Sequence, residues 1–152
     1  MRVLGNKMSF ENIMIFTVKI KLVNGIYATD DWVCNIEIPS DLNLEDFHLV
    51  IQDILDFDDD HMYEFYIANS ERGKPIARFE CDDEQIEETS ISELILNSKG
   101  KKAFYFFDYG DSWLFQISKS RKKTFQPVVD IEYPRIISEV GVKPEQYPNW
   151  EE

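Results

Sequence analysis

Hydrophobic and polar residues alternate along two segments near the start of the chain. Residues 16–23 read FTVKIKLV, and residues 32–38 read WVCNIEI. A period of two is typical of strands that are buried on one face. The turn dipeptide Asn24-Gly25 follows the first segment, and Pro39 ends the second. The pattern predicts an antiparallel pair of strands.

The period then becomes helical over residues 43–56. Asn43 is placed to cap a helix, and Glu45 and Asp46 fall in its first turn, where negative charge is favourable. Apolar residues recur at helical spacing and form one face for a sheet: Phe47, Val50, Ile51, Ile54 and Leu55. This segment predicts the main helix of the fold.

The middle of the chain gives a strand, a loop and a short helix. Residues 62–68 read MYEFYIA, which favours a strand. Residues 71–90 are acidic and nearly free of large apolar side chains, so we expect a mobile loop there. Residues 90–97 predict a short helix that Gly100 helps to end.

Seven aromatic residues gather in residues 102–118, KAFYFFDYGDSWLFQIS. We expect two strands around a Tyr109-Gly110 loop, with Gly110 at positive φ. That register places Phe106 opposite Trp113 and Phe104 opposite Phe115, all facing the main helix. A ligand platform is the alternative, but cross-strand aromatic pairing favours a core.

Together these segments predict the α+β class. We expect one domain over residues 13–148, preceded by a flexible arm at residues 1–12. The predicted sheet is mixed and mostly antiparallel, with the main helix (43–56) and the short helix (90–97) packed on one face.

Composition narrows the classes of partner. The chain of 152 residues has 29 acidic and 16 basic side chains, a formal net charge of −13, and this charge argues against direct binding of nucleic acid. Residues 41–64 hold nine acidic residues and neither Lys nor Arg. The two cysteines form no metal or disulfide motif, and the sequence shows neither a signal peptide nor a membrane span, so we expect a cytoplasmic protein.

Four residues carry candidate chemistry: His48, His61, Asp108 and Asp111. Two imidazoles and two carboxylates could share protons or hold a divalent cation, with His48 and His61 as the metal candidates. Their spacing matches no catalytic or metal motif, so structural hydrogen bonds are the alternative. The acidic residues 56–60 also fail as a calcium loop, because His61 and Ile67 stand where that loop needs Gly and Glu.

Three patterns occur in order along the chain: Leu44-x-x-Phe-His-x-x-Ile-Gln52, Phe57-Asp-Asp-Asp-His-x-x-x-Phe65 and Phe107-Asp-Tyr-Gly-Asp-Ser-Trp113. Over roughly residues 13–148 the chain resembles the plasmid pRiA4b ORF-3-like family, which is also known as a TnpR-like transposon passenger protein. The resemblance implies an α+β domain, helices on one side of a mixed sheet, and no established biochemical activity. The motif residues that it marks are His48, Gln52, Asp60, His61, Phe65, Asp108, Gly110, Asp111 and Trp113.

The sequence departs from the family pattern in two places. Tyr63 and Phe115 stand where many members carry histidine, and residues 133–147 replace a Cys- and Gly-rich segment. The resolvase-like name also fails on the residues, because Tyr133-Pro-Arg-Ile-Ile-Ser138 lacks the spacing of a serine recombinase site.

We therefore expect a non-enzymatic interaction domain of a mobile-element-associated family, without a cofactor. A protein is the expected partner, and a basic protein is one candidate for it. The alternative function is a small metal-dependent enzyme that uses the His and Asp candidates.

Overall fold

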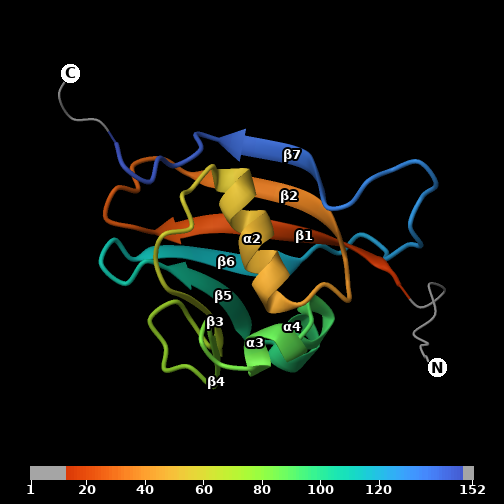
Figure 1. Ribbon diagram of the computed structural model, residues 1–152, viewed down its shortest axis with the longest axis horizontal. Helices are drawn as coiled ribbons and strands as arrows, with labels where there is room; N and C mark the ends of the chain where they lie inside the picture. Colours follow the sequence, from red (N-terminus) through yellow and green to blue (C-terminus); the bar gives the residue numbers. More distant parts are fainter. Residues whose placement is uncertain (1–12, 149–152) are drawn as a thin grey trace.

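Seven strands form one antiparallel sheet in the computed structural model, which describes residues 13–148 (Figure 1). In space they lie in the order β4-β3-β5-β6-β1-β2-β7, and every pairing is antiparallel. The strands are β1 (Ile15–Asn24), β2 (Trp32–Pro39), β3 (Tyr63–Ala68), β4 (Ala77–Glu80), β5 (Lys102–Phe107), β6 (Trp113–Lys119) and β7 (Arg135–Gly141). The α+β class is confirmed, and the predicted pairing of the first two strands is confirmed.

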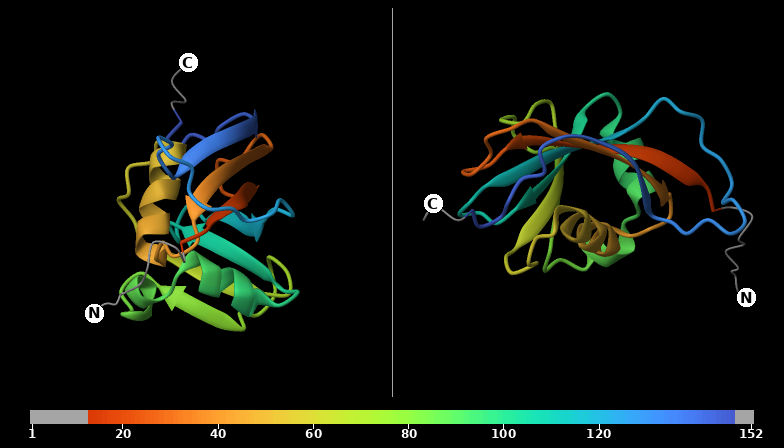
Figure 2. Two further views of the ribbon diagram at one scale, coloured as in Figure 1. Left: turned by 90° about the vertical axis from the view of Figure 1, so that its right-hand side faces the viewer. Right: turned by 90° about the horizontal axis from the view of Figure 1, so that it is seen from above.

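Within residues 13–148, three helices cover one face of this curved sheet: α2 (Leu44–Leu55), α3 (Gln85–Glu88) and α4 (Ile91–Ser98) (Figure 2). The Asn43 side chain accepts a hydrogen bond from the Asp46 amide at 2.8 Å, which satisfies a free donor of the first turn of α2. Ser90 and Glu93 form a reciprocal capping box at α4. Both predicted helices are confirmed. Each begins at a cap formed by residues that are close together in the sequence.

The main core lies between the helices and the concave face of the sheet. Phe47 of α2 stacks on Phe65 of β3 with ring centroids 5.5 Å apart. Trp113 is fully buried, as predicted for a core residue. A Cβ atom added at Gly25 would lie 2.6 Å from the Trp113 ring, so this glycine allows the close approach of the β1–β2 turn to the indole.

The prediction of a loop throughout residues 71–90 is wrong. Strand β4 pairs with β3 there, and α3 buries Ile86 in the core. One buried apolar side chain per helical turn gives little periodicity, and β4 becomes a strand only through its pairing with β3.

The predicted register of the aromatic hairpin is also wrong, by one residue. Phe107 pairs with Trp113, and Tyr105 pairs with Phe115. A slip of one residue reverses the faces, so Phe104 and Phe106 lie in a second, smaller apolar cluster on the outer face with Tyr66, Ala68, Leu114 and Val23. The cause is the loop, in which positive φ falls at Asp108 (65°) and Ser112 (58°) and not at Gly110.

Strand β7 extends the sheet beyond the region where we expected strands. It pairs with β2 with a register shift between Asn35 and Ile36. The arm predicted at residues 1–12 lies outside the described residues. Within residues 13–148, no helix is long and apolar enough to cross a membrane.

Candidate functional site

His48 lies on the sheet-facing side of α2, where its ring is 3% exposed. Its Nδ1 atom lies 2.6 Å from the Tyr105 hydroxyl, and its Nε2 atom lies 2.6 Å from Asp59 Oδ1. The ring also stacks on Tyr63, with centroids 3.6 Å apart. Helix α2, strands β3 and β5 and the loop after α2 therefore all position this histidine.

These contacts close into a cycle of four residues, which we call the His48 network. The Gln52 amide donates to the Tyr105 oxygen at 2.9 Å, and the Asp59 backbone N–H donates to Gln52 Oε1 at 2.9 Å. The Asp59 carboxylate accepts, so His48 Nε2 carries a hydrogen and donates it to Asp59. In a neutral ring Nδ1 then accepts from the Tyr105 hydroxyl, whose oxygen accepts in turn from Gln52.

The electrostatics of the His48 network agree with a neutral ring. Burial lowers the pKa of His48, and the hydrogen bond and charge of Asp59 oppose this shift only in part. Burial also raises the pKa of Tyr105 well above its ordinary value. The His48 ring therefore stays neutral, and the Tyr105 hydroxyl stays protonated, across the neutral pH range.

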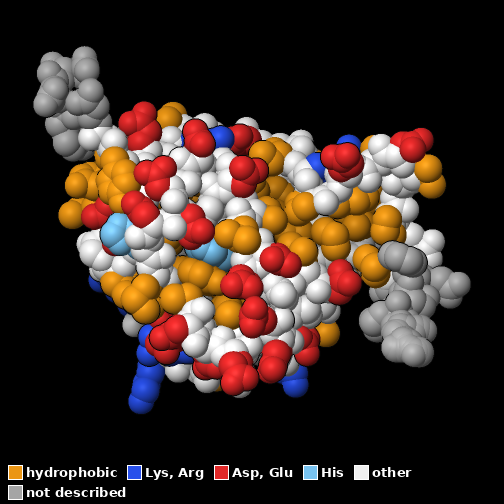
Figure 3. All heavy atoms as spheres, viewed as in Figure 1, with side chains coloured by type: hydrophobic (Ala, Val, Ile, Leu, Met, Phe, Trp, Pro, Cys, Tyr) orange, Lys and Arg blue, Asp and Glu red, His pale blue; other side chains and the backbone are white. Residues whose placement is uncertain are grey.

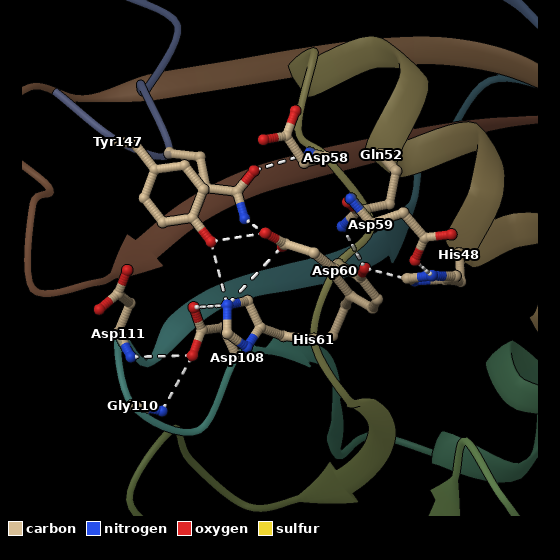
Figure 4. A network of polar contacts seen from close by, with 12 residues as sticks. His48, Gln52, Asp58, Asp59, Asp60, His61, Asp108, Gly110, Asp111 and Tyr147 are labelled. Carbon is tan, nitrogen blue, oxygen red and sulfur yellow. Dashed lines mark hydrogen bonds and ion pairs between the residues drawn. The ribbon is translucent and has the colours of Figure 1, made fainter.

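His61 lies at a second group of polar residues, the His61 network, between the loop after α2 and the β5–β6 loop (Figure 4). Its Nε2 atom is 3.3 Å from Asp108 Oδ2, 3.7 Å from Asp60 Oδ1 and 3.0 Å from the Tyr147 hydroxyl. Unlike His48, it is 42% exposed. The Phe107 ring contacts both histidines, with centroids 6.1 Å from each.

Asp108 holds the β5–β6 loop in shape. Its buried carboxylate accepts hydrogen bonds from the backbone N–H groups of Gly110 at 3.0 Å and Asp111 at 3.2 Å. Gly110 therefore contributes a backbone N–H group that holds the loop, and it does not adopt the positive φ that the sequence predicted. Partial burial, together with the charge of Asp108, raises the pKa of Asp111.

The C-terminal segment Lys143–Tyr147 crosses the loop after α2, and sequence reasoning missed its role. The Gln146 side chain accepts from the Asp58 N–H at 2.7 Å and donates to Asp60 at 2.9 Å. The Tyr147 hydroxyl donates to Asp60 at 2.7 Å, which lowers the pKa of Asp60 and raises that of Tyr147 to about 12. No local pattern marks these contacts, because they join residues more than 80 positions apart.

The structure thus brings together three of the four predicted site residues, His61, Asp108 and Asp111, and adds Asp60. His48 belongs to the neighbouring His48 network, which includes the motif residue Gln52. The remaining motif residues Phe65 and Trp113 are buried in the core. Within residues 13–148, no group of three or more His, Cys, Asp or Glu side chains is arranged to hold a metal ion.

A groove opens beside the His61 network, between the end of α2 and the segment Lys143–Tyr147. This acidic groove has a volume of about 450 Å³, and its lining includes Asp56, Asp58 and Glu145. Lys143 is the one basic residue among the described residues of its lining. Acidic side chains gather over this part of the face in Figure 3.

These observations define a single-domain α+β protein whose polar motif residues fix two loops beside an acidic groove. Residues 14–146 match the family described as plasmid pRiA4b ORF-3-like protein, and the chain belongs to this family. A crystal structure of a protein of unknown function from Methanosarcina mazei Go1 has a similar fold, with a TM-score of 0.67 and 20% sequence identity over 86% of this chain and 72% of that chain. None of the curated proteins matches the chain.

Proposed function

We propose that this chain is a non-enzymatic protein-binding domain that receives a basic protein partner in its acidic groove. The two networks support this function, because their histidines and carboxylates are already paired within the protein and thereby fix the loop between α2 and β3. A cytoplasmic location fits two free cysteines. The family name refers to a plasmid, and we extend the proposal to a role alongside mobile elements.

The observation that carries the proposal is the groove itself. Gln146 and Tyr147 hold the acidic loop against the C-terminal segment through the Asp58 backbone and the Asp60 carboxylate, so the loop that carries Asp58 of the groove has a fixed backbone. A loop held in this way loses little backbone freedom when a Lys or Arg side chain binds, and complementary charge accelerates association.

The test is cross-linking of the full chain in its native host, followed by calorimetric titration of the purified pair. The groove variant Asp56→Asn, Asp58→Asn, Glu145→Gln removes three charges from the groove. A matched variant, Glu84→Gln, Glu87→Gln, Glu88→Gln, removes three charges around α3. We expect the groove variant to bind at least about tenfold more weakly, and the α3 variant to bind nearly as well as the wild type.

Salt provides a second readout, because an electrostatic interface weakens as ionic strength rises. The proposal fails if no stoichiometric partner is cross-linked, or if both triple variants bind as tightly as the wild type. Stoichiometric metal in the purified chain, with a melting temperature that falls in EDTA, would instead favour the metal-dependent enzyme.

A further inference from the structure

Strand β7 ends the sheet with an open edge. It pairs with β2 on one side, and no strand in the described part of the chain lies on its other side (Figure 1). An edge strand directs unpaired N–H and C=O groups outward, which makes it a template for an added strand.

The two edges of the sheet differ in their protection. Strand β4 has four residues, and its Arg78 pairs with Glu64 at 2.6 Å and Glu80 at 3.0 Å. Short length and charge are the usual ways to block an edge. Strand β7 has seven residues, with Ile136 46% and Val140 66% exposed. The β7 edge also carries charges, at Arg135 and Glu139, but it is longer than the β4 edge and exposes two large apolar side chains.

A second groove, which we call the β7 groove, runs between β7 and helix α2. It has a volume of about 370 Å³, and its apolar lining comes from Ile36, Val50, Ile54 and Ile136. Hydrophobic side chains lie on this face between α2 and β7 in Figure 3. Lys143 lines both this groove and the acidic groove, so the two adjoin.

We infer that β7 and the β7 groove bind an extended segment of the protein partner as an added strand of the sheet. This inference rests on the proposed function and names the part of the partner that binds. Main-chain hydrogen bonds to β7 would supply affinity, and every second side chain of the segment would enter the apolar groove.

Charge identifies a basic partner segment as the occupant, in preference to a second copy of this chain. Two copies would each bring a formal charge of −13 to a shared edge. Both basic residues of the β7 groove already have acidic neighbours: Arg135 lies 2.7 Å from Glu37, and Lys143 lies 4.0 Å from Glu139. Asp53 of the same lining has no ion pair among the described residues. The segment should therefore alternate apolar residues with Lys or Arg.

The test uses a synthetic peptide that alternates lysine with valine and is as long as β7. We expect it to bind the full chain and to slow hydrogen exchange of the amides of Arg135–Gly141. Its counterpart with every backbone amide methylated keeps the side chains but cannot donate strand hydrogen bonds, and should not bind. A peptide that alternates glutamate with valine should bind at least about tenfold more weakly.

Two substitutions of exposed apolar residues provide a matched pair. Ile136→Lys places a charge in the groove, whereas Leu96→Lys places the same charge on α4, outside the lining of the groove. Both sites are exposed, so thermal melts should show that both variants fold. We expect Ile136→Lys to weaken binding of the lysine–valine peptide and Leu96→Lys to leave it nearly unchanged.

The inference is overturned if the lysine–valine peptide does not bind, if β7 exchange is unchanged at saturation, or if the methylated peptide binds equally well. Sedimentation that shows a dimer formed through β7 would replace the partner segment with a second copy. A native partner that cross-links at the acidic groove and leaves β7 exchange unchanged would end this inference and leave the proposed function standing.

Discussion

At the scale of single residues, His48 and His61 show how similar motif residues can serve different purposes. The His48 imidazole lies between a carboxylate and a tyrosine hydroxyl, as a catalytic base would, but the ring and Tyr105 are both buried and the cycle with Gln52 is closed. His61, by contrast, is 42% exposed. The His48 ring therefore makes its hydrogen bonds within the protein, and these bonds fix α2 and the loop that follows.

The lowered pKa of His48 predicts a loss of stability in mild acid. In the unfolded chain a histidine takes up a proton near pH 6.5, whereas the folded ring resists it. As the pH falls through this value, the unfolded state binds more protons and the free energy of unfolding decreases. Urea denaturation from pH 7.5 down to about 5.5 should therefore give a falling midpoint for the wild type.

Variants of the two histidines separate this effect from general acid sensitivity. His48→Gln should be less stable at neutral pH, because it breaks the network, but should lose less stability on acidification. His61→Gln, which alters the exposed histidine, should retain the decline of the wild type. An equal decline in all three proteins would contradict the role of His48.

At the scale of elements, sequence patterns predicted the helices and strands that depend on interactions between residues close together in the chain. The cap at Asn43, the stop signal at Gly100 and the alternation in residues 16–23 identified two helices and a strand before any tertiary contact was known. The Gly110 prediction failed because Asp108 adopts a positive φ that its own carboxylate, hydrogen-bonded to the loop amides, helps to hold. A rule that assigns positive φ to glycine cannot see this compensation.

Long-range partners explain the other failures. Strand β7 is exposed along most of its length and lacks the alternation of a half-buried strand, so only its pairing with β2 defines it. Likewise, the motif predicted His48 and Gln52 as site residues, but it could not predict that Tyr105 lies between them. That contact depends on how β5 sits beneath α2.

The corrected hairpin register predicts different costs for two adjacent phenylalanines. Phe107→Ala should lower the free energy of unfolding by about 3–5 kcal/mol, because Phe107 is fully buried beneath the helices. Phe106→Ala, on the outer face, should cost about 1 kcal/mol. Urea denaturation of both variants measures the difference. A greater loss for Phe106 would return it to the helix-facing side and restore the register first expected.

At the scale of the whole molecule, the excess of acidic side chains places like charges close together on neighbouring elements. The chain carries a formal charge of −13, and α3 contacts the acidic first turn of α2. Partial desolvation and the nearby Glu87 carboxylate raise the pKa of Glu45. Such repulsion between folded elements opposes folding, so the acidic surface that suits a basic partner carries a cost in stability.

This repulsion predicts that salt stabilises the free protein. Screening weakens interactions between exposed charges beyond about 8 Å at physiological ionic strength, so the melting temperature should rise between low and moderate sodium chloride. The α3 variant Glu84→Gln, Glu87→Gln, Glu88→Gln should melt about 2 °C higher than the wild type at low salt and should respond less to added salt. The groove variant removes the same number of charges but leaves Glu45 beside Glu87, so its gain should be smaller. Equal melting temperatures for the wild type and the α3 variant at every salt concentration would show that repulsion between α2 and α3 does not limit stability, and the acidic surface would then cost the fold nothing at that place.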